Sequence, residues 1–124
     1  SGALERFMAV MIEHFAGKFP LWLSPVQVRL LTLTDRNKDF AYSVAAKMQE
    51  HDIRVEVDAR VESMGKKVRD AQVEKVNYIV TVGDKEQEAN TLAVRKRGEQ
   101  ETKFGVPVFD FVQKLVEEIR ERRL

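Results

Sequence analysis

Residues 58–69 contain the side chains best suited to binding chemistry, in the order Asp-Ala-Arg-Val-Glu-Ser-Met-Gly-Lys-Lys-Val-Arg. Lys66, Lys67 and Arg69 place three cations within four residues. A helix is expected to begin here, and the free N–H groups of a first helical turn bind phosphate. Gly65 lacks a side chain and would let another backbone approach closely. The stretch indicates a phosphate contact, although a basic helix face in solvent is the simpler interpretation.

A second polar set combines residues 83–86, Gly-Asp-Lys-Glu, with the cations Arg-Lys-Arg at 95–97 on the next strand. In a hairpin, Glu86 and Arg95 would face one another. A carboxylate accepts hydrogen bonds from the N1–H and N2–H₂ edge of guanine, and an arginine donates to O6 and N7. The pair indicates guanine recognition or, alternatively, a cross-strand salt bridge, which contributes little to stability when exposed.

Signatures of catalysis are missing from the sequence. The chain has no cysteine, which excludes disulfides, zinc–thiolate sites and thiol chemistry. His14 and His51 are the two histidines, and neither has a partner at metal-ligand spacing. There is no Gly-x-Ser-x-Gly elbow or Walker loop, and the turn after the first expected strand has no glycine. We expect no catalytic residue and no metal site, and a flavodoxin-like regulator that binds a small molecule is disfavoured.

The elements that must position these side chains alternate between strands and helices. We expect strands at 26–33, 53–58, 78–82 and 92–97, a short polar strand near 99–103, and helices at 4–14, 40–50, 63–75 and after Pro107. Such alternation is typical of an α/β domain with a mostly parallel sheet and helices on both faces. Because the late strands follow one another closely, at least one should be antiparallel. Ligands of such sheets bind beyond the carboxyl ends of the parallel strands, near Thr34 and residues 58–62 and 83–86.

Length and composition fit one globular domain, with 124 residues of which 33% are charged and 44% hydrophobic. Lys and Arg number 21 and Asp and Glu 20, so any nucleic-acid binding must come from a local patch. No apolar run approaches the roughly 18 residues of a membrane span, and no signal-peptide pattern opens the sequence. We expect a cytoplasmic protein that does not enter a membrane.

The segment between Pro20 and Pro25 carries three consecutive large apolar residues, Leu21, Trp22 and Leu23. A cluster of large apolar side chains is normally buried against other residues. They either fill the core of the domain or form an interface with a neighbouring domain.

Five motifs in order carry a resemblance to the C-terminal anticodon-binding domain of threonyl-tRNA synthetases, a class II family. They are GALERF at 2–7, FPLWLSPVQV at 19–28, GKKVR at 65–69, VGDKE at 82–86 and VR at 94–95. The resemblance covers essentially the whole chain, and the second motif is the most specific, being shared mainly with threonyl and related prolyl, histidyl and glycyl enzymes. It implies the class II anticodon-binding fold, a mixed sheet of about five strands flanked by helices, with an extra N-terminal helix from the catalytic-domain junction. Residues 1–25 would be that junction, and residues 26–124 the anticodon-binding domain.

The resemblance also implies a function. Family members activate threonine with ATP and transfer it to tRNA, using a catalytic domain that precedes this one. The opening motif looks like the end of class II motif 3, which would make Arg6 an ATP ligand separated from its active site. This chain alone would then bind the anticodon stem-loop of threonine tRNA without catalysing the ligation or holding a cofactor. ATP and zinc would belong to the missing catalytic domain, and the parent enzyme would be a homodimer.

Carried over position by position, the resemblance places anticodon-reading residues in two groups. Arg60 and Glu62 form the first, with Gly65, Lys66, Lys67 and Arg69 beside them to position the phosphate backbone. Glu86 and Arg95 form the second, and a guanine-reading pair fits threonine anticodons, which share G and U at their second and third positions.

Two positions depart from the family pattern. Val61 stands where asparagine is common, and valine cannot hydrogen-bond a base. Asn77 stands where a proline often precedes the tyrosine.

The alternative to an anticodon-binding part of a synthetase is a non-catalytic synthetase-like module that binds RNA or a protein.

Overall fold

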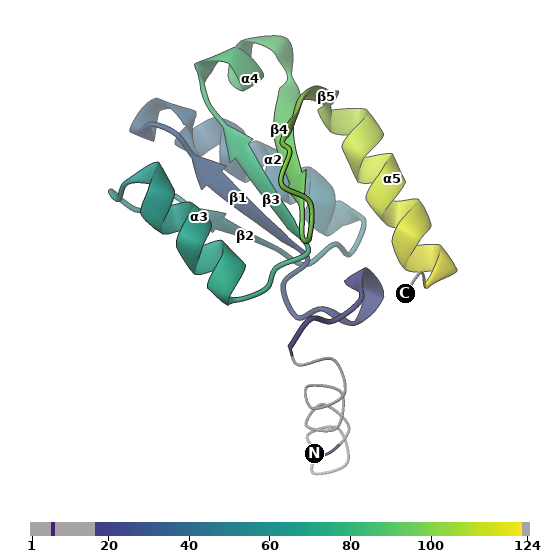
Figure 1. The fold of residues 1–124 in the computed structure, drawn as a ribbon. Helices are drawn as coiled ribbons and strands as arrows, with labels where there is room; N and C mark the ends of the chain where they lie inside the picture. Colours follow the sequence, from purple (N-terminus) through teal and green to yellow (C-terminus); the bar gives the residue numbers. More distant parts are fainter. Residues whose placement is uncertain (1–5, 7–16, 123–124) are drawn as a thin grey trace.

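The computed structural model describes Arg6 and residues 17–122, and it is built around a sheet of five strands in the order β2-β1-β3-β4-β5 (Figure 1). The strands are β1 (Val28–Thr32), β2 (Val55–Asp58), β3 (Tyr78–Val82), β4 (Thr91–Lys96) and β5 (Lys103–Pro107). The helices are η1 (Leu21–Leu23), η2 (Asp35–Asn37), α2 (Lys38–Glu50), α3 (Met64–Val73), α4 (Asp84–Ala89) and α5 (Val108–Glu121). Within this part of the chain, no helix has both the length and the apolar character to cross a membrane.

The sheet is mixed, as the sequence predicted. β1 pairs in parallel with β2 and with β3, whereas β3–β4 and β4–β5 are antiparallel. The two parallel pairs are each joined through a helix, α2 after β1 and α3 after β2. The carboxyl ends of β1, β2 and β3 therefore meet at one edge, where Thr32, Asp58 and Val82 end their strands.

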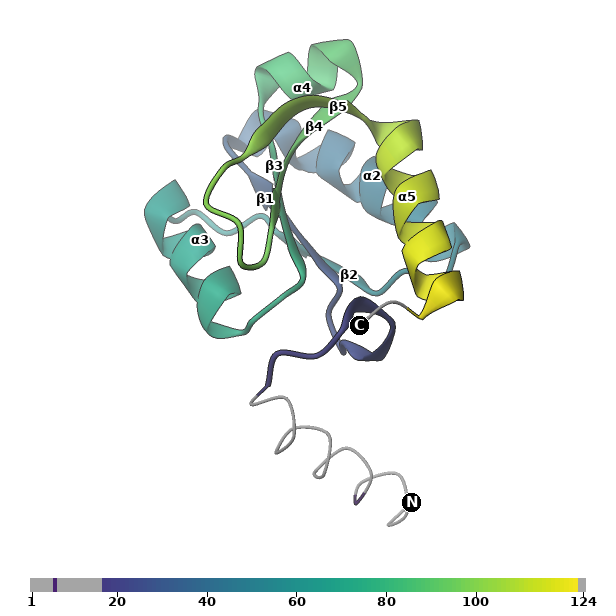
Figure 2. The same ribbon diagram turned by 45° about the vertical axis from the view of Figure 1, so that its right-hand side comes forward.

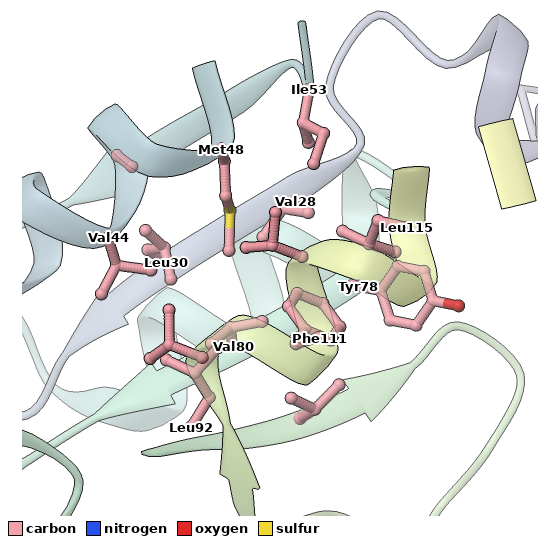
Figure 3. Close-up of a cluster of buried hydrophobic side chains, with 14 of the residues drawn as sticks. Val28, Leu30, Val44, Met48, Ile53, Tyr78, Val80, Leu92, Phe111 and Leu115 are labelled. Atoms are coloured by element: carbon pink, nitrogen blue, oxygen red, sulfur yellow. The ribbon is translucent and has the colours of Figure 1, made fainter. Parts of the chain in front are cut away.

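The main core lies on the face of the sheet that α2 and α5 cover. It contains Val44 and Met48 from α2, Phe111 and Leu115 from α5, and Tyr78, whose ring meets that of Phe111 edge to face at 5.4 Å (Figure 3). These residues recur every three or four positions along each helix, so each helix presents one apolar stripe to the sheet. A smaller cluster on the other face packs α3 against the sheet through Leu31, Ala71, Val76 and Ile79.

The α3 face of the sheet is only partly covered. Figure 1 shows α3 on the side of β1 and β2, and Figure 2 shows the β4–β5 hairpin between α3 and α5. Among the described elements, no helix covers β4 and β5 on this side. Thr91 and Arg95 of β4 are half-buried there, and Phe104 of β5 is 75% exposed.

The structure corrects two predictions about the second half of the chain. Residues 84–89 form the short helix α4, where a turn had been expected, so Glu86 lies on a helix. The polar strand expected near 99–103 is displaced to β5, at Lys103–Pro107. Gly98 adopts a left-handed φ of 89° in the β4–β5 connection, and a register shift in this strand pair accompanies Gly105 at φ 67°.

Hydrogen bonds hold the segment from Phe19 to Pro25 at the edge of the sheet where the parallel strands begin. The carbonyl of Phe19 accepts hydrogen bonds from Ser24 Oγ (3.2 Å), Asn77 Nδ2 (3.0 Å) and Arg97 Nη2 (2.9 Å). Leu21 is buried in the main core, and Trp22 is half-buried with the Arg122 guanidinium 5.5 Å from its ring centre. Leu21 therefore fills the core, which is one of the two roles foreseen for this loop. The helix predicted at 4–14 lies outside the described residues, and the boundary proposed at residue 25 stays a prediction.

Candidate nucleic-acid interface

Arg60 lies directly beyond the carboxyl end of β2 and is held by two carboxylates. Its Nε and Nη2 atoms donate to Asp58, both at 2.8 Å, and Nη2 also donates to Asp70 of α3 at 2.8 Å. A guanidinium has five N–H donors, so the two on Nη1 have no partner within the described residues. The Arg60 side chain is 48% exposed. The two carboxylates thus orient Arg60 while leaving one edge of it open to a ligand.

This ion-pair network shifts the pKa values of its members. The hydrogen bond from Arg60 holds the pKa of Asp58 below its ordinary value, although burial of the carboxyl group opposes this. The same guanidinium lowers the pKa of Asp70, and the Asp58 carboxylate, followed by Asp70, raises the pKa of Arg60. All three groups therefore stay charged at neutral pH.

The first turn of α3 is built as the sequence indicated. Ser63 caps the helix, and its Oγ accepts a hydrogen bond of 3.2 Å from the backbone N–H of Lys66. Gly65 is exposed, and a Cβ atom added there would meet nothing within 4 Å. Lys66, Arg69 and Glu62 are also exposed, and Lys66 Nζ lies 3.9 Å from Asp70. Val61 is 98% exposed on the same loop, so it presents an apolar surface to solvent in place of a hydrogen-bonding side chain.

Lys67 lies elsewhere than the sequence suggested. It is 3% exposed, and its Nζ donates to the carbonyl of Thr32 at 2.9 Å and to Thr32 Oγ1 at 3.3 Å. The amine is thus used to join α3 to the carboxyl end of β1. We correct the prediction that Lys67 contacts the phosphate backbone, because a buried amine with internal partners cannot reach it.

Helix α4 holds Glu86 at the carboxyl end of β3. Glu86 Oε1 accepts a hydrogen bond of 2.8 Å from the backbone N–H of Gly83, just before the helix. Asp84 accepts from Arg36 at 2.8 Å and from the buried Asn37 at 2.9 Å. Sequence inspection missed these anchors in η2, since neither residue belongs to a motif with a recognisable binding role.

Arg95 and Glu86 do not contact each other. Arg95 pairs with Ile79 in the β3–β4 register, and its Nε donates to the carbonyl of Glu99 at 3.1 Å. Ile79 and Gly83 are four residues apart on the chain, which along a strand is about 13 Å. The direct cross-strand pairing expected for a hairpin is therefore wrong. Arg95 lies on the α3 face of the sheet, as its partner Ile79 does, whereas Glu86 lies on α4 beyond the carboxyl end of β3.

Arg6 is exposed, and the residues around it lie outside the described part of the chain. Its proposed contact with ATP therefore stays a prediction. Within the described residues, no group of three or more His, Cys, Asp or Glu side chains is arranged to hold a metal ion.

A family model described as "Anticodon binding domain" matches residues 27–118. The chain belongs to this family. Nearly the whole of this chain also resembles one part of threonine–tRNA ligases. It is 44% identical over 122 residues to the enzyme of Carboxydothermus hydrogenoformans and 48% identical over 121 residues to that of Clostridium tetani, in each case over 98% of this chain and 19% of the relative. The chain thus spans about a fifth of the length of these curated relatives.

Solved structures show the same fold. The RNA-binding domain of threonyl-tRNA synthetase from Cryptosporidium parvum superimposes with a TM-score of 0.81 at 28% identity, over 91% of this chain and 28% of that one. Prolyl-tRNA synthetase from the same organism matches in fold, with a TM-score of 0.72 at 24% identity, over 84% of this chain and 23% of that one. The fold and the family resemblance predicted from the five motifs are confirmed.

Proposed function

We propose that this domain reads the anticodon of threonine tRNA as one part of a threonine–tRNA ligase. The observation that carries the proposal is the 42–48% identity to such ligases over 98–99% of the chain, together with the family model over residues 27–118. Activation of threonine with ATP, a bound zinc ion and dimerisation would then belong to the remainder of the longer protein, in the cytoplasm. This chain would contribute tRNA binding alone.

The geometry supports two separate contacts with the anticodon. Arg60 offers its free Nη1 edge beside Glu62, Lys66 and Arg69 at the start of α3. Arg95 lies on the uncovered part of the α3 face and Glu86 on α4 beyond the carboxyl end of β3, so an anticodon with unstacked bases could place one base near each group. Single-stranded loops are the part of RNA in which unstacked bases present their hydrogen-bonding edges.

The experiment that tests the proposal uses the chain itself and a fluorescent RNA hairpin with a threonine anticodon. Binding is measured by anisotropy at one fixed salt concentration, because affinities for RNA depend strongly on salt. Replacing the second anticodon base, guanine, should weaken binding by about 1–3 kcal/mol, the usual range for one lost base contact. A matched control hairpin carries a base-pair swap in its stem. Equal affinity for all three RNAs would contradict the proposal and favour the non-catalytic RNA- or protein-binding module.

A further inference from the structure

A cleft of about 170 Å³ lies at the opposite end of the sheet from the Arg60 network. Its walls are the end of α3, the start of β3 and the end of β4 with the turn that follows. Five cations line it, against the single carboxylate of Glu99: Lys18, Lys75, Arg95, Lys96 and Arg97. The whole chain has a net charge of only +1, so this cleft concentrates positive charge that the rest of the surface balances.

Four of the five cations of this cleft, all but Lys75, differ from those at the carboxyl edge in having no carboxylate partner within the described residues. Arg36, Arg60 and Lys66 each form an ion pair with an aspartate. Over the described range, Lys18, Arg95, Lys96 and Arg97 form none, and Arg95 donates only to a backbone carbonyl. The carboxyl edge is therefore largely neutralised internally, whereas the cleft retains its charge.

Arg97 shows most clearly that the charge is uncompensated. Its guanidinium is half-buried and donates to two backbone carbonyls, that of Lys75 at 3.0 Å and that of Phe19 at 2.9 Å. Burial without a neighbouring carboxylate lowers the pKa of Arg97. An anion in the cleft would supply the missing negative charge. Arg97 also donates to the Lys75 carbonyl, just beyond the end of α3, which reduces the repulsion between that carbonyl and an anion.

We propose that this cleft, lined by Lys18, Lys96 and Arg97, binds a backbone phosphate of the RNA whose base is read at Arg95. This deepens the proposed function and rests on it for the identity of the RNA. The cleft adjoins Arg95 directly and opens on the partly uncovered α3 face of the sheet. Lysine and arginine contacts to phosphate position a strand without reading its sequence. The cleft would hold the strand so that Arg95 meets one base.

The test is the double variant K18Q/K96Q, because both lysines are exposed and neither side chain forms a hydrogen bond or ion pair within the described residues. K47Q is the matched control, an exposed lysine of α2 on the other face of the sheet. Affinity for the threonine hairpin and for the hairpin with a changed second anticodon base is measured at several salt concentrations. The slope of log K against log salt should fall by about 0.7 in magnitude for one lost phosphate contact of a single strand. Affinity should fall several-fold, by the same factor for both hairpins.

Three results would be decisive. If K18Q/K96Q matches K47Q in affinity and in slope, the phosphate site is wrong. If inorganic phosphate shifts the amide NMR signals of Gly98 and Glu99 while the double variant binds both hairpins normally, the cleft takes free phosphate, and the RNA contact is again wrong. If the wild-type chain binds both hairpins equally and the double variant weakens both, anticodon reading fails but the phosphate site stands. The charge reversal K96E, checked for unchanged melting, should weaken RNA binding further than K96Q.

Discussion

Arg60 donates two hydrogen bonds of 2.8 Å to the carboxylate of Asp58, the last residue of β2. The Asp58 side chain is 5% exposed, so the pair fixes the guanidinium at the carboxyl edge of the sheet. The loop that follows β2 therefore presents a charged group whose orientation is set before any ligand arrives. This is the preorganisation that lowers the entropic cost of binding.

Acid should weaken the domain through Asp58. Its folded-state pKa lies below the unfolded value of about 3.9, so it stabilises the fold fully above roughly pH 5. That contribution is lost as the pH falls through 4 toward the folded pKa. D58N should be less stable at pH 7 by about 1.5–3 kcal/mol, the range for a hydrogen bond to a charged group, and its stability should fall less steeply in acid. Urea unfolding between pH 3 and 7 measures both effects. The exposed Glu101 offers the control E101Q, and an identical acid profile for D58N and the wild type would contradict the assignment.

Lys67 should be a structural lysine. K67A removes the hydrogen bonds to Thr32 and should lower the free energy of unfolding by about 1–3 kcal/mol. K66A, the exposed neighbour, should change stability by no more than about 0.5 kcal/mol and should weaken binding to every RNA alike. Thermal melting and hairpin titration of the two variants separate the roles. Unchanged stability with lost RNA binding in K67A would return Lys67 to the phosphate contacts.

Glu86 and Arg95 should act independently on RNA affinity. They do not touch and share no partner, so their effects should add to within about 0.5 kcal/mol in the double variant E86Q/R95A. A double-mutant cycle on the threonine hairpin measures this. A coupling well above that value would show that both groups contact one base, as the hairpin interpretation first held.

Trp22 should contribute to stability and not to RNA binding. It is half-buried beneath Arg122, so W22A should destabilise by about 2 kcal/mol, less than the roughly 3–5 kcal/mol of a fully buried ring. Melting gives the first value, and titration with the hairpin at a temperature where the variant is folded gives the second. Unchanged melting with weakened RNA binding would indicate base stacking on the ring.

Patterns within short windows predicted much of the fold. The strand at Tyr78–Val82 and the helix after Pro107 are where their apolar residues placed them, because the strand is a mostly apolar run buried on both faces of the sheet and the helix buries one apolar stripe. α4 escaped prediction because its sequence, Asp-Lys-Glu-Gln-Glu-Ala, has no apolar period. Besides the local hydrogen bond from the Gly83 N–H to Glu86, tertiary contacts stabilise it, since Asn37 donates to Asp84 and to Gln87, 47 and 50 residues later in the chain.

In the candidate site too, local sequence patterns predict some features and tertiary contacts determine others. Candidate residues such as Lys66 and Arg69 could be named from the sequence because motifs report residue type and order, and both are exposed. Lys66 and Lys67 are adjacent and chemically identical, yet one is exposed and the other buried. That difference depends on Thr32, 35 residues away along the chain, and no local pattern contains it. The unpaired charge at Lys96 and Arg97 is likewise visible only once the partners of every cation are known.

Arg95 should read the guanine of the anticodon. The most direct test compares wild type and R95A on the threonine hairpin and on the hairpin with that base changed, at one salt concentration. R95A should lose about 1–3 kcal/mol on the matched hairpin and little on the changed one, so that discrimination between the two RNAs collapses. An equal loss on both hairpins would contradict the claim and assign Arg95 to the phosphate backbone.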